Sequence, residues 1–134
     1  MRTKQALTYE DAQKIAAAAQ AEALKHHWKV CIAIVDDGAR LLHFQRLDGA
    51  PLASIDISIA KATSAMLGKR PTKIYEDTIN GGRYSALSMP GITHMEGGVP
   101  IIVAGECVGA VGVSGVKSSE DAQIAQAAVS ALTG

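Results

Sequence analysis

Residues 29–47 of the chain read KVCIAIVDDGARLLHFQRL. The first part, residues 29–35, is a run that is continuously apolar after Lys29 and rich in β-branched side chains, which is typical of a buried strand. Asp37 and Gly38 follow, and an Asp-Gly pair is the preferred chemistry of a tight hairpin turn. Residues 40–47 then return as a second strand. The stretch predicts an antiparallel hairpin, because parallel neighbours would need a long crossover between them.

Helical patterns flank this hairpin on both sides. Upstream, apolar residues at three- and four-residue spacing predict an amphipathic helix that starts at its cap, Thr8, and ends near His26. Downstream, the same spacing predicts a helix over residues 52–67 that stops at Gly68. Thr72 is expected to cap a short helix that runs to Ile79.

The last third of the chain predicts a second hairpin and a final helix. Residues 83–95 have no clear periodicity and indicate a loop that holds at most a fragment of regular structure. Residues 99–104 and 107–113 read as two strands, and Ser118 or Ser119 caps a last helix. This order of elements predicts an α+β fold, a central antiparallel sheet flanked by helices. Since no linker divides the sequence, we expect a single domain over residues 1–134.

Composition excludes several classes of protein. The chain has 134 residues, of which 48% are apolar, so it can bury a hydrophobic core without disulfide bonds or a structural metal to stabilise it. Its 13 basic and 13 acidic residues form no basic stripe, which argues against binding to nucleic acid. No apolar run approaches the roughly 20 residues that span a bilayer. The first seven residues lack the apolar core of a secretory signal, so we expect a cytoplasmic protein.

Cysteines and glycines have mainly structural interpretations. Cys31 and Cys107 lie in apolar segments without zinc-ligand spacing and are expected to be buried thiols. The glycines of residues 109–115 match neither phosphate-binding fingerprint and indicate bulges or close backbone approach. Gly97 and Gly98 leave two interpretations open, either a backbone that a ligand can approach or a sharp entry into a strand.

The histidines and one lysine are the candidates for chemistry. His26 and His27 are adjacent, so on a helix they diverge by about 100° and cannot jointly hold one ion. Near a helix C-terminus an imidazole also offsets the helix dipole. His94 lies in the glycine-rich loop. Lys61 is either a buried amine with a depressed pKa or a side chain that reaches water.

Several segments together resemble the GlcG/HbpS family, which also includes the C-terminal domain of PduO-type cobalamin adenosyltransferases. Each segment alone is common, but their order and spacing across residues 6–132 are specific. The segments are VCIAIVDDGA (30–39), RLDGA (46–50), SIAKA (58–62), GGVPI (97–101) and VGAVGVSG (108–115).

The resemblance implies a profilin-like or PAS-like fold and dimers that assemble further, commonly to octamers. It also implies binding of haem, with roles in haem sensing, haem breakdown or protection, and cobalamin recycling. Other members belong to glycolate or diol utilisation. This sequence contains only the family domain, without an adenosyltransferase portion or a secretion signal, which argues against the extracellular sensor role.

The resemblance also selects site residues. His26, His27 and His94 are the candidates for the axial ligand of haem, because one histidine and an apolar slot suffice. The family motifs contain further candidates for the lining of the cleft: Arg46, Asp48, Lys61, Gly97 and Gly98. Arg46 or Lys61 could pair with haem propionates or another small carboxylate. The alternative is a structural ion pair with Asp48 or Asp56.

Three functions follow from these expectations. The first is a haem- or tetrapyrrole-binding module. The second is an enzyme that acts on a small oxidised organic acid, with Arg46 or Lys61 holding the carboxylate. The third is a structural or sensory assembly module, whose cleft has no function of its own.

Overall fold

The computed structural model describes residues 1–133 and has the predicted α+β architecture. Its elements follow the predicted order, and only their ends shift by a few residues. In chain order they are α1 (Tyr9–Lys25), β1 (Cys31–Asp36), β2 (Leu41–Arg46), α2 (Ser54–Gly68), α3 (Lys73–Asn80), the 3-10 helix η1 (Tyr84–Ser88), β3 (Gly98–Val103), β4 (Glu106–Ser114) and α4 (Ser118–Thr133).

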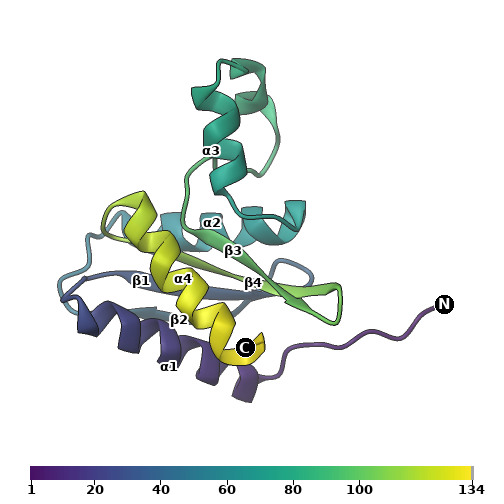
Figure 1. Ribbon diagram of the computed structural model, residues 1–134, viewed down its shortest axis with the longest axis vertical. Coiled ribbons are helices and arrows are strands. Elements are labelled where there is room, and N and C mark those ends of the chain that lie inside the picture. The colour runs from purple at the N-terminus through teal and green to yellow at the C-terminus, as the bar shows by residue number, and fades with distance from the viewer. Residues whose placement is uncertain (134) are drawn as a thin grey trace.

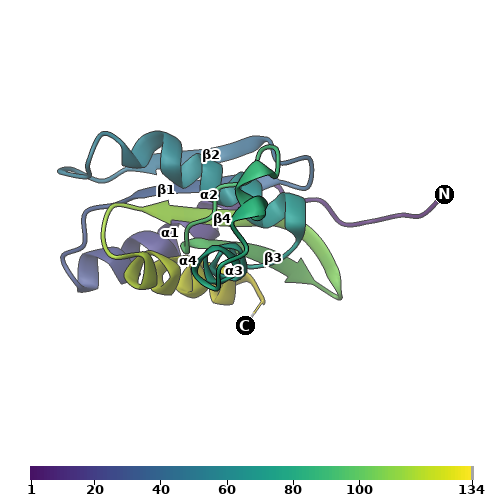
Figure 2. The same cartoon turned by 90° about the horizontal axis from the view of Figure 1, so that it is seen from above.

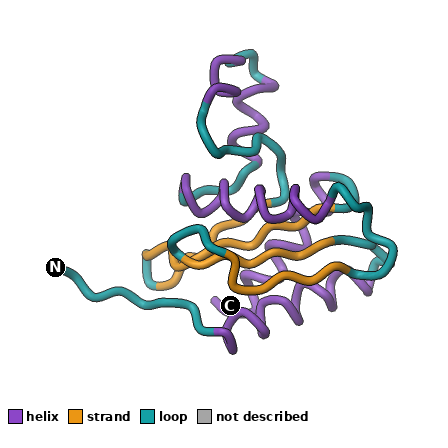
Figure 3. The backbone as a smooth tube through the Cα atoms, turned by 180° about the vertical axis from the view of Figure 1, so that it is seen from behind, coloured by secondary structure: helices purple, strands orange, loops and turns teal. Residues whose placement is uncertain are grey.

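The four strands form one antiparallel sheet in the order β2-β1-β4-β3. Helix α2 covers one face of the sheet, and α1 and α4 lie side by side on the other (Figures 2 and 3). Helix α3 and η1 stand away from the sheet as a projection, residues 73–88, which we call the arm (Figure 1). No helix within residues 1–133 is long and apolar enough to cross a membrane.

Strand β1 contributes to the core on both of its faces. Ile32 and Ile34 pack with α1 and α4, whereas Ala33 and Val35 pack with α2. Successive side chains of a strand point to opposite faces, so a strand covered on both faces must be apolar at every position. This explains the continuous apolar run in the sequence.

The first hairpin forms as predicted, although its turn is longer than two residues. The Asp36 carboxylate accepts hydrogen bonds from the backbone amides of Gly38 and Arg40, both at 2.9 Å. Ala39 takes the left-handed conformation, with a φ of 59°. The aspartate therefore holds the turn, and the strained position falls after Gly38.

Two predicted helix caps have different outcomes. Thr8 caps α1 in a reciprocal box with Asp11, as expected. Thr72 precedes α3 but its side chain does not cap that helix. Its hydroxyl instead accepts a hydrogen bond from the Gly98 amide at 2.9 Å, and so joins the start of the arm to β3.

The predicted close approach at the glycines of β4 is confirmed. A Cβ on Gly112 would clash with the carbonyl oxygen of Ser58 on α2. The absence of a side chain lets α2 lie directly on β4. Cys31 is buried and Cys107 is half-buried, both as free thiols, and burial raises the pKa of each.

Candidate functional site

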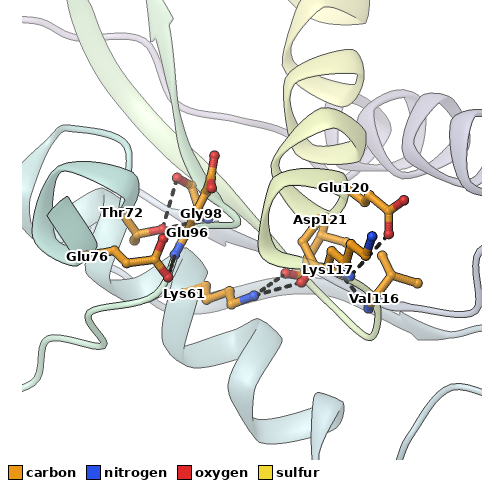
Figure 4. A network of polar contacts seen from close by, with 10 residues as sticks. Lys61, Thr72, Glu76, Glu96, Gly98, Val116, Lys117, Glu120 and Asp121 are labelled. Atoms are coloured by element: carbon orange, nitrogen blue, oxygen red, sulfur yellow. Dashed lines mark hydrogen bonds and ion pairs between the residues drawn. The ribbon is translucent and has the colours of Figure 1, made fainter. Parts of the chain in front are cut away.

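A buried ion pair links the helices that cover the two faces of the sheet. Lys61 comes from α2 and Asp121 from the first turn of α4 (Figure 4). The Lys61 Nζ donates to Asp121 Oδ2 at 3.0 Å and to the carbonyl oxygen of Val113 at 3.0 Å. Both charged residues are 1% exposed. Lys61 is thus buried, and its side chain does not reach water.

Asp121 has a second partner and a shifted pKa. The backbone amide of Val116 donates to its Oδ1 at 3.2 Å. Burial raises the pKa of Asp121 to about 6, although the Lys61 ammonium and the Val116 amide act in the opposite direction. Desolvation disfavours the charged form and outweighs the two favourable partners. The carboxyl therefore titrates close to neutral pH.

Gly97 and Gly98 lie directly against this ion pair. Gly97 has a φ of +133°, and a Cβ there would lie 2.7 Å from the Lys61 Nζ. A Cβ on Gly98 would clash with the Lys61 carbonyl oxygen and lie 2.8 Å from Thr72. Close packing of Lys61 and Thr72 accounts for both glycines, although they also border a shallow cleft of about 250 Å³.

The other charged candidates lie at the surface. Arg46 and Asp48 are exposed, and Arg46 forms no ion pair with any other residue from 1 to 133. Lys61 pairs with Asp121 and not with Asp48 or Asp56. The alternative of a structural ion pair with Asp48 or Asp56 is therefore wrong for both Arg46 and Lys61. Sequence reasoning missed Asp121 because an acid in the first turn of a helix already has a local explanation, the helix dipole.

His26 is engaged by its neighbours at the end of α1. Its Nε2 lies 3.1 Å from Glu22 Oε2 and 3.3 Å from Gln123 Nε2. Its ring stacks on Trp28, with the two ring centroids 4.3 Å apart. These contacts give His26 a structural role and fix the indole beside it.

His27 is free by comparison. It has a left-handed backbone with a φ of 58°, its side chain is exposed, and its imidazole has no hydrogen-bond partner in the described part of the chain. The ring borders a cleft of about 360 Å³. The lining residues are Gln20, Leu24, His27, Trp28, Lys29, Leu47 and Asp48. The fold thus brings two of the predicted residues, His27 and Asp48, to one cleft.

His94 occupies a third position, near the base of the arm. Its Nε2 is enclosed by protein and has no hydrogen-bond partner among residues 1–133. Its ring meets that of Tyr75 edge to face, with centroids 5.8 Å apart. Within residues 1–133, no cluster of three or more His, Cys, Asp or Glu side chains could hold a metal ion.

The family model described as "Haem degrading protein HbpS-like" matches residues 7–130 of the chain. The chain belongs to the HbpS-like family. Among curated relatives, the GlcG protein of Escherichia coli K12 is 49% identical over 115 residues, which cover 85% of each chain. An uncharacterised 15.0 kDa protein of Citrobacter freundii is 34% identical over 127 residues, 92% of this chain and 89% of the relative.

Solved structures agree with this assignment. A double mutant of HbpS from Streptomyces reticuli superposes with a TM-score of 0.91 at 30% identity, covering 100% of this chain and 92% of the other. A complex of PduOC with haem superposes with a TM-score of 0.85 at 28% identity, covering 95% of both chains. The HbpS-like fold of the chain is therefore shown, and one structural relative is known with haem bound.

Proposed function

We propose that the chain binds haem through His27 and serves in haem handling. The observation that carries this proposal is an exposed imidazole at the edge of an apolar cleft, without a partner in the part of the chain that the structure describes. Neutral imidazole is the commonest metal ligand among side chains. Membership of the HbpS-like family and the haem complex of PduOC support the same ligand.

The residues around His27 suit a porphyrin. Trp28, Leu24 and Leu47 would supply apolar surface for a bound porphyrin. The Lys29 side chain packs over Gly49, where a Cβ would lie 3.3 Å from the Lys29 Nζ. Its ammonium offers a partner for a propionate. Bound haem would supply an iron centre for redox or oxygen chemistry. The chain itself would orient the ring and provide the axial nitrogen.

The other two candidate histidines fit less well. His26 is held by Glu22 and Gln123 and stacks on Trp28, and it is not among the residues that line the cleft. His94 is closed off, so a porphyrin could reach its Nε2 only after the surrounding side chains had moved. Lys61 is equally inaccessible, which disfavours the enzyme hypothesis in which it holds a substrate carboxylate.

Titration with haemin, followed by the Soret band, tests the proposal. The wild type should form a saturable complex, and His27→Ala should lose its axial-ligand spectrum. His43→Ala is the matched control, because His43 is a half-buried histidine of β2 outside the cleft lining. A His27→Ala spectrum identical to that of the wild type would remove His27 from the site.

The cellular location of the chain and its assembly with further copies are part of the same proposal. We infer a cytoplasmic homo-oligomer, between a dimer and an octamer. Large apolar side chains exposed on the body and arm support self-association, among them Leu52 at 76%, Tyr84 at 68% and Leu87 at 61% exposure. Sedimentation at micromolar protein concentration would measure the state directly, and a monomer would refute it.

A further inference from the structure

A separate cleft lies where the arm meets the body, between the end of α2 and the segment after η1. Its volume is about 480 Å³, within the range of small-molecule sites. Much of its wall is apolar and open, with Leu67 at 56% and Met89 at 41% exposure. The lining residues are Leu67, Gly68, Arg70, Tyr75, Met89, Pro90 and Ile92. None of them belongs to the lining of the His27 cleft.

Arg70 places a positive charge at this cleft without a counterion. Its Nε donates to the carbonyl oxygen of Gly68 at 3.3 Å, and its guanidinium lies 6.0 Å from the centre of the Tyr75 ring. No carboxylate among residues 1–133 pairs with it. The nearby Lys73, by contrast, is neutralised by Asp77 at 2.8 Å. The terminal nitrogens of Arg70 remain available to a ligand.

Tyr75 provides a fixed polar group beside Arg70. The side chain is 6% exposed, and its hydroxyl packs so closely on Gly68 that a Cβ there would clash with it. The His94 ring holds it from the edge. The hydroxyl has no hydrogen-bond partner in the described residues. A guanidinium and a phenol hydroxyl thus line the same cleft, both with unused hydrogen-bonding capacity.

We propose that this cleft binds a small amphipathic organic acid. The carboxylate pairs with Arg70, whose planar fork matches carboxylate geometry, and accepts a hydrogen bond from the Tyr75 hydroxyl. The hydrocarbon part covers Leu67, Met89 and Ile92. The proposal is independent of the haem proposal, since the two clefts share no lining residue.

Calorimetric titration with octanoate tests this assignment, with octan-1-ol as the uncharged probe. Octanoate should bind more tightly than octan-1-ol. Arg70→Ala should weaken octanoate by about tenfold to a hundredfold, the cost of one charge-assisted hydrogen bond, and leave octan-1-ol unchanged. Leu67→Ser should weaken both probes. Arg40→Ala, at an exposed arginine in the β1–β2 turn, is the matched control and should change neither.

Three outcomes would overturn the assignment. They are no binding of octanoate by the wild type, equal binding of octanoate and octan-1-ol, and full octanoate affinity in Arg70→Ala. A His27→Ala variant that keeps octanoate affinity supports a separate site. Competition between haemin and octanoate at Arg70 would show that haem uses this cleft, which also contradicts the proposal.

Discussion

Lys61 and Asp121 are 60 residues apart in sequence and belong to helices on opposite faces of the sheet, yet their charged atoms lie 3.0 Å apart (Figure 4). Because Val113 and Val116 supply the remaining hydrogen bonds, the pair is satisfied on both sides. It fastens the start of α4 to α2 at the end of β4. Of the two clefts discussed above, the one that Arg70 lines includes the end of α2.

Removal of one partner should destabilise the fold strongly. Lys61→Met leaves the Asp121 carboxyl buried without its counterion, which typically costs about 3–5 kcal/mol. Lys73→Met is the matched control, since Lys73 pairs with Asp77 at the surface and should cost at most about 1 kcal/mol. Urea unfolding of both variants measures the difference. Similar losses in the two variants would show that burial of the first pair is unimportant.

Removal of both charges should restore part of the stability that is lost in Lys61→Met. Lys61→Met combined with Asp121→Leu replaces the buried ions by apolar side chains, and such replacements are often neutral or stabilising. The double variant should unfold at a higher urea concentration than Lys61→Met alone. A double variant less stable than Lys61→Met would mean that Asp121 stabilises the fold without Lys61.

Stability should depend on pH through Asp121. The folded pKa of about 6 lies above the ordinary value of 3.8, so between these values the folded state binds more protons than the unfolded state. This contribution to stability is present below pH 3.8 and is lost as pH rises through 6. The free energy of unfolding of the wild type should therefore rise relative to Asp121→Asn as pH falls from 7 to 4. A constant difference would place the pKa elsewhere.

Gly97 should tolerate no side chain. Gly97→Ala combines a positive φ with a Cβ 2.7 Å from the Lys61 Nζ, so overpacking adds about 1–3 kcal/mol to the backbone strain. Gly105→Ala is the control, because Gly105 also has a positive φ, +80°, but open space around its Cα. Gly105→Ala should lower the stability of the fold by only about 1–2 kcal/mol. Equal midpoints in a thermal melt would refute the packing account.

An apolar residue should replace His94 without loss. The buried Nε2 has no hydrogen-bond partner within the described residues, and an unsatisfied buried polar group costs about 1–3 kcal/mol. His94→Leu is therefore expected to be neutral or to stabilise the protein by about 1 kcal/mol in urea unfolding. A loss of more than about 2 kcal/mol would reveal a hydrogen bond to His94 that its surroundings do not show.

The sequence predicts the elements of this fold better than its contacts. The apolar run of β1 and the periodicity of the helices follow from local burial, so strands and helices could be placed within a few residues. The partner of Lys61 could not, because nothing near Lys61 in the sequence indicates that residue 121 of another helix lies beside it. Likewise, Arg70 shows its role only when Tyr75, Met89 and the end of α2 converge on one cleft.

The histidines show the same limit. Adjacent His26 and His27 are equivalent in the sequence, and only the end of α1 separates them. The His26 ring is held by Glu22 and Trp28, whereas His27 has a left-handed backbone and is one of the residues that line the cleft. The sequence therefore narrowed the axial candidates to three, and the surroundings of each ring favour one.

Haemin titration of His27→Gly with and without free imidazole tests the central claim most directly. Because His27 is exposed, its removal leaves the position open to solvent, and added imidazole should take the place of the missing ligand. We predict that His27→Gly loses the axial-imidazole Soret spectrum, that imidazole restores it, and that His94→Leu keeps it throughout. A His27→Gly protein with an unchanged spectrum, or a His94→Leu protein that loses it, would contradict the account.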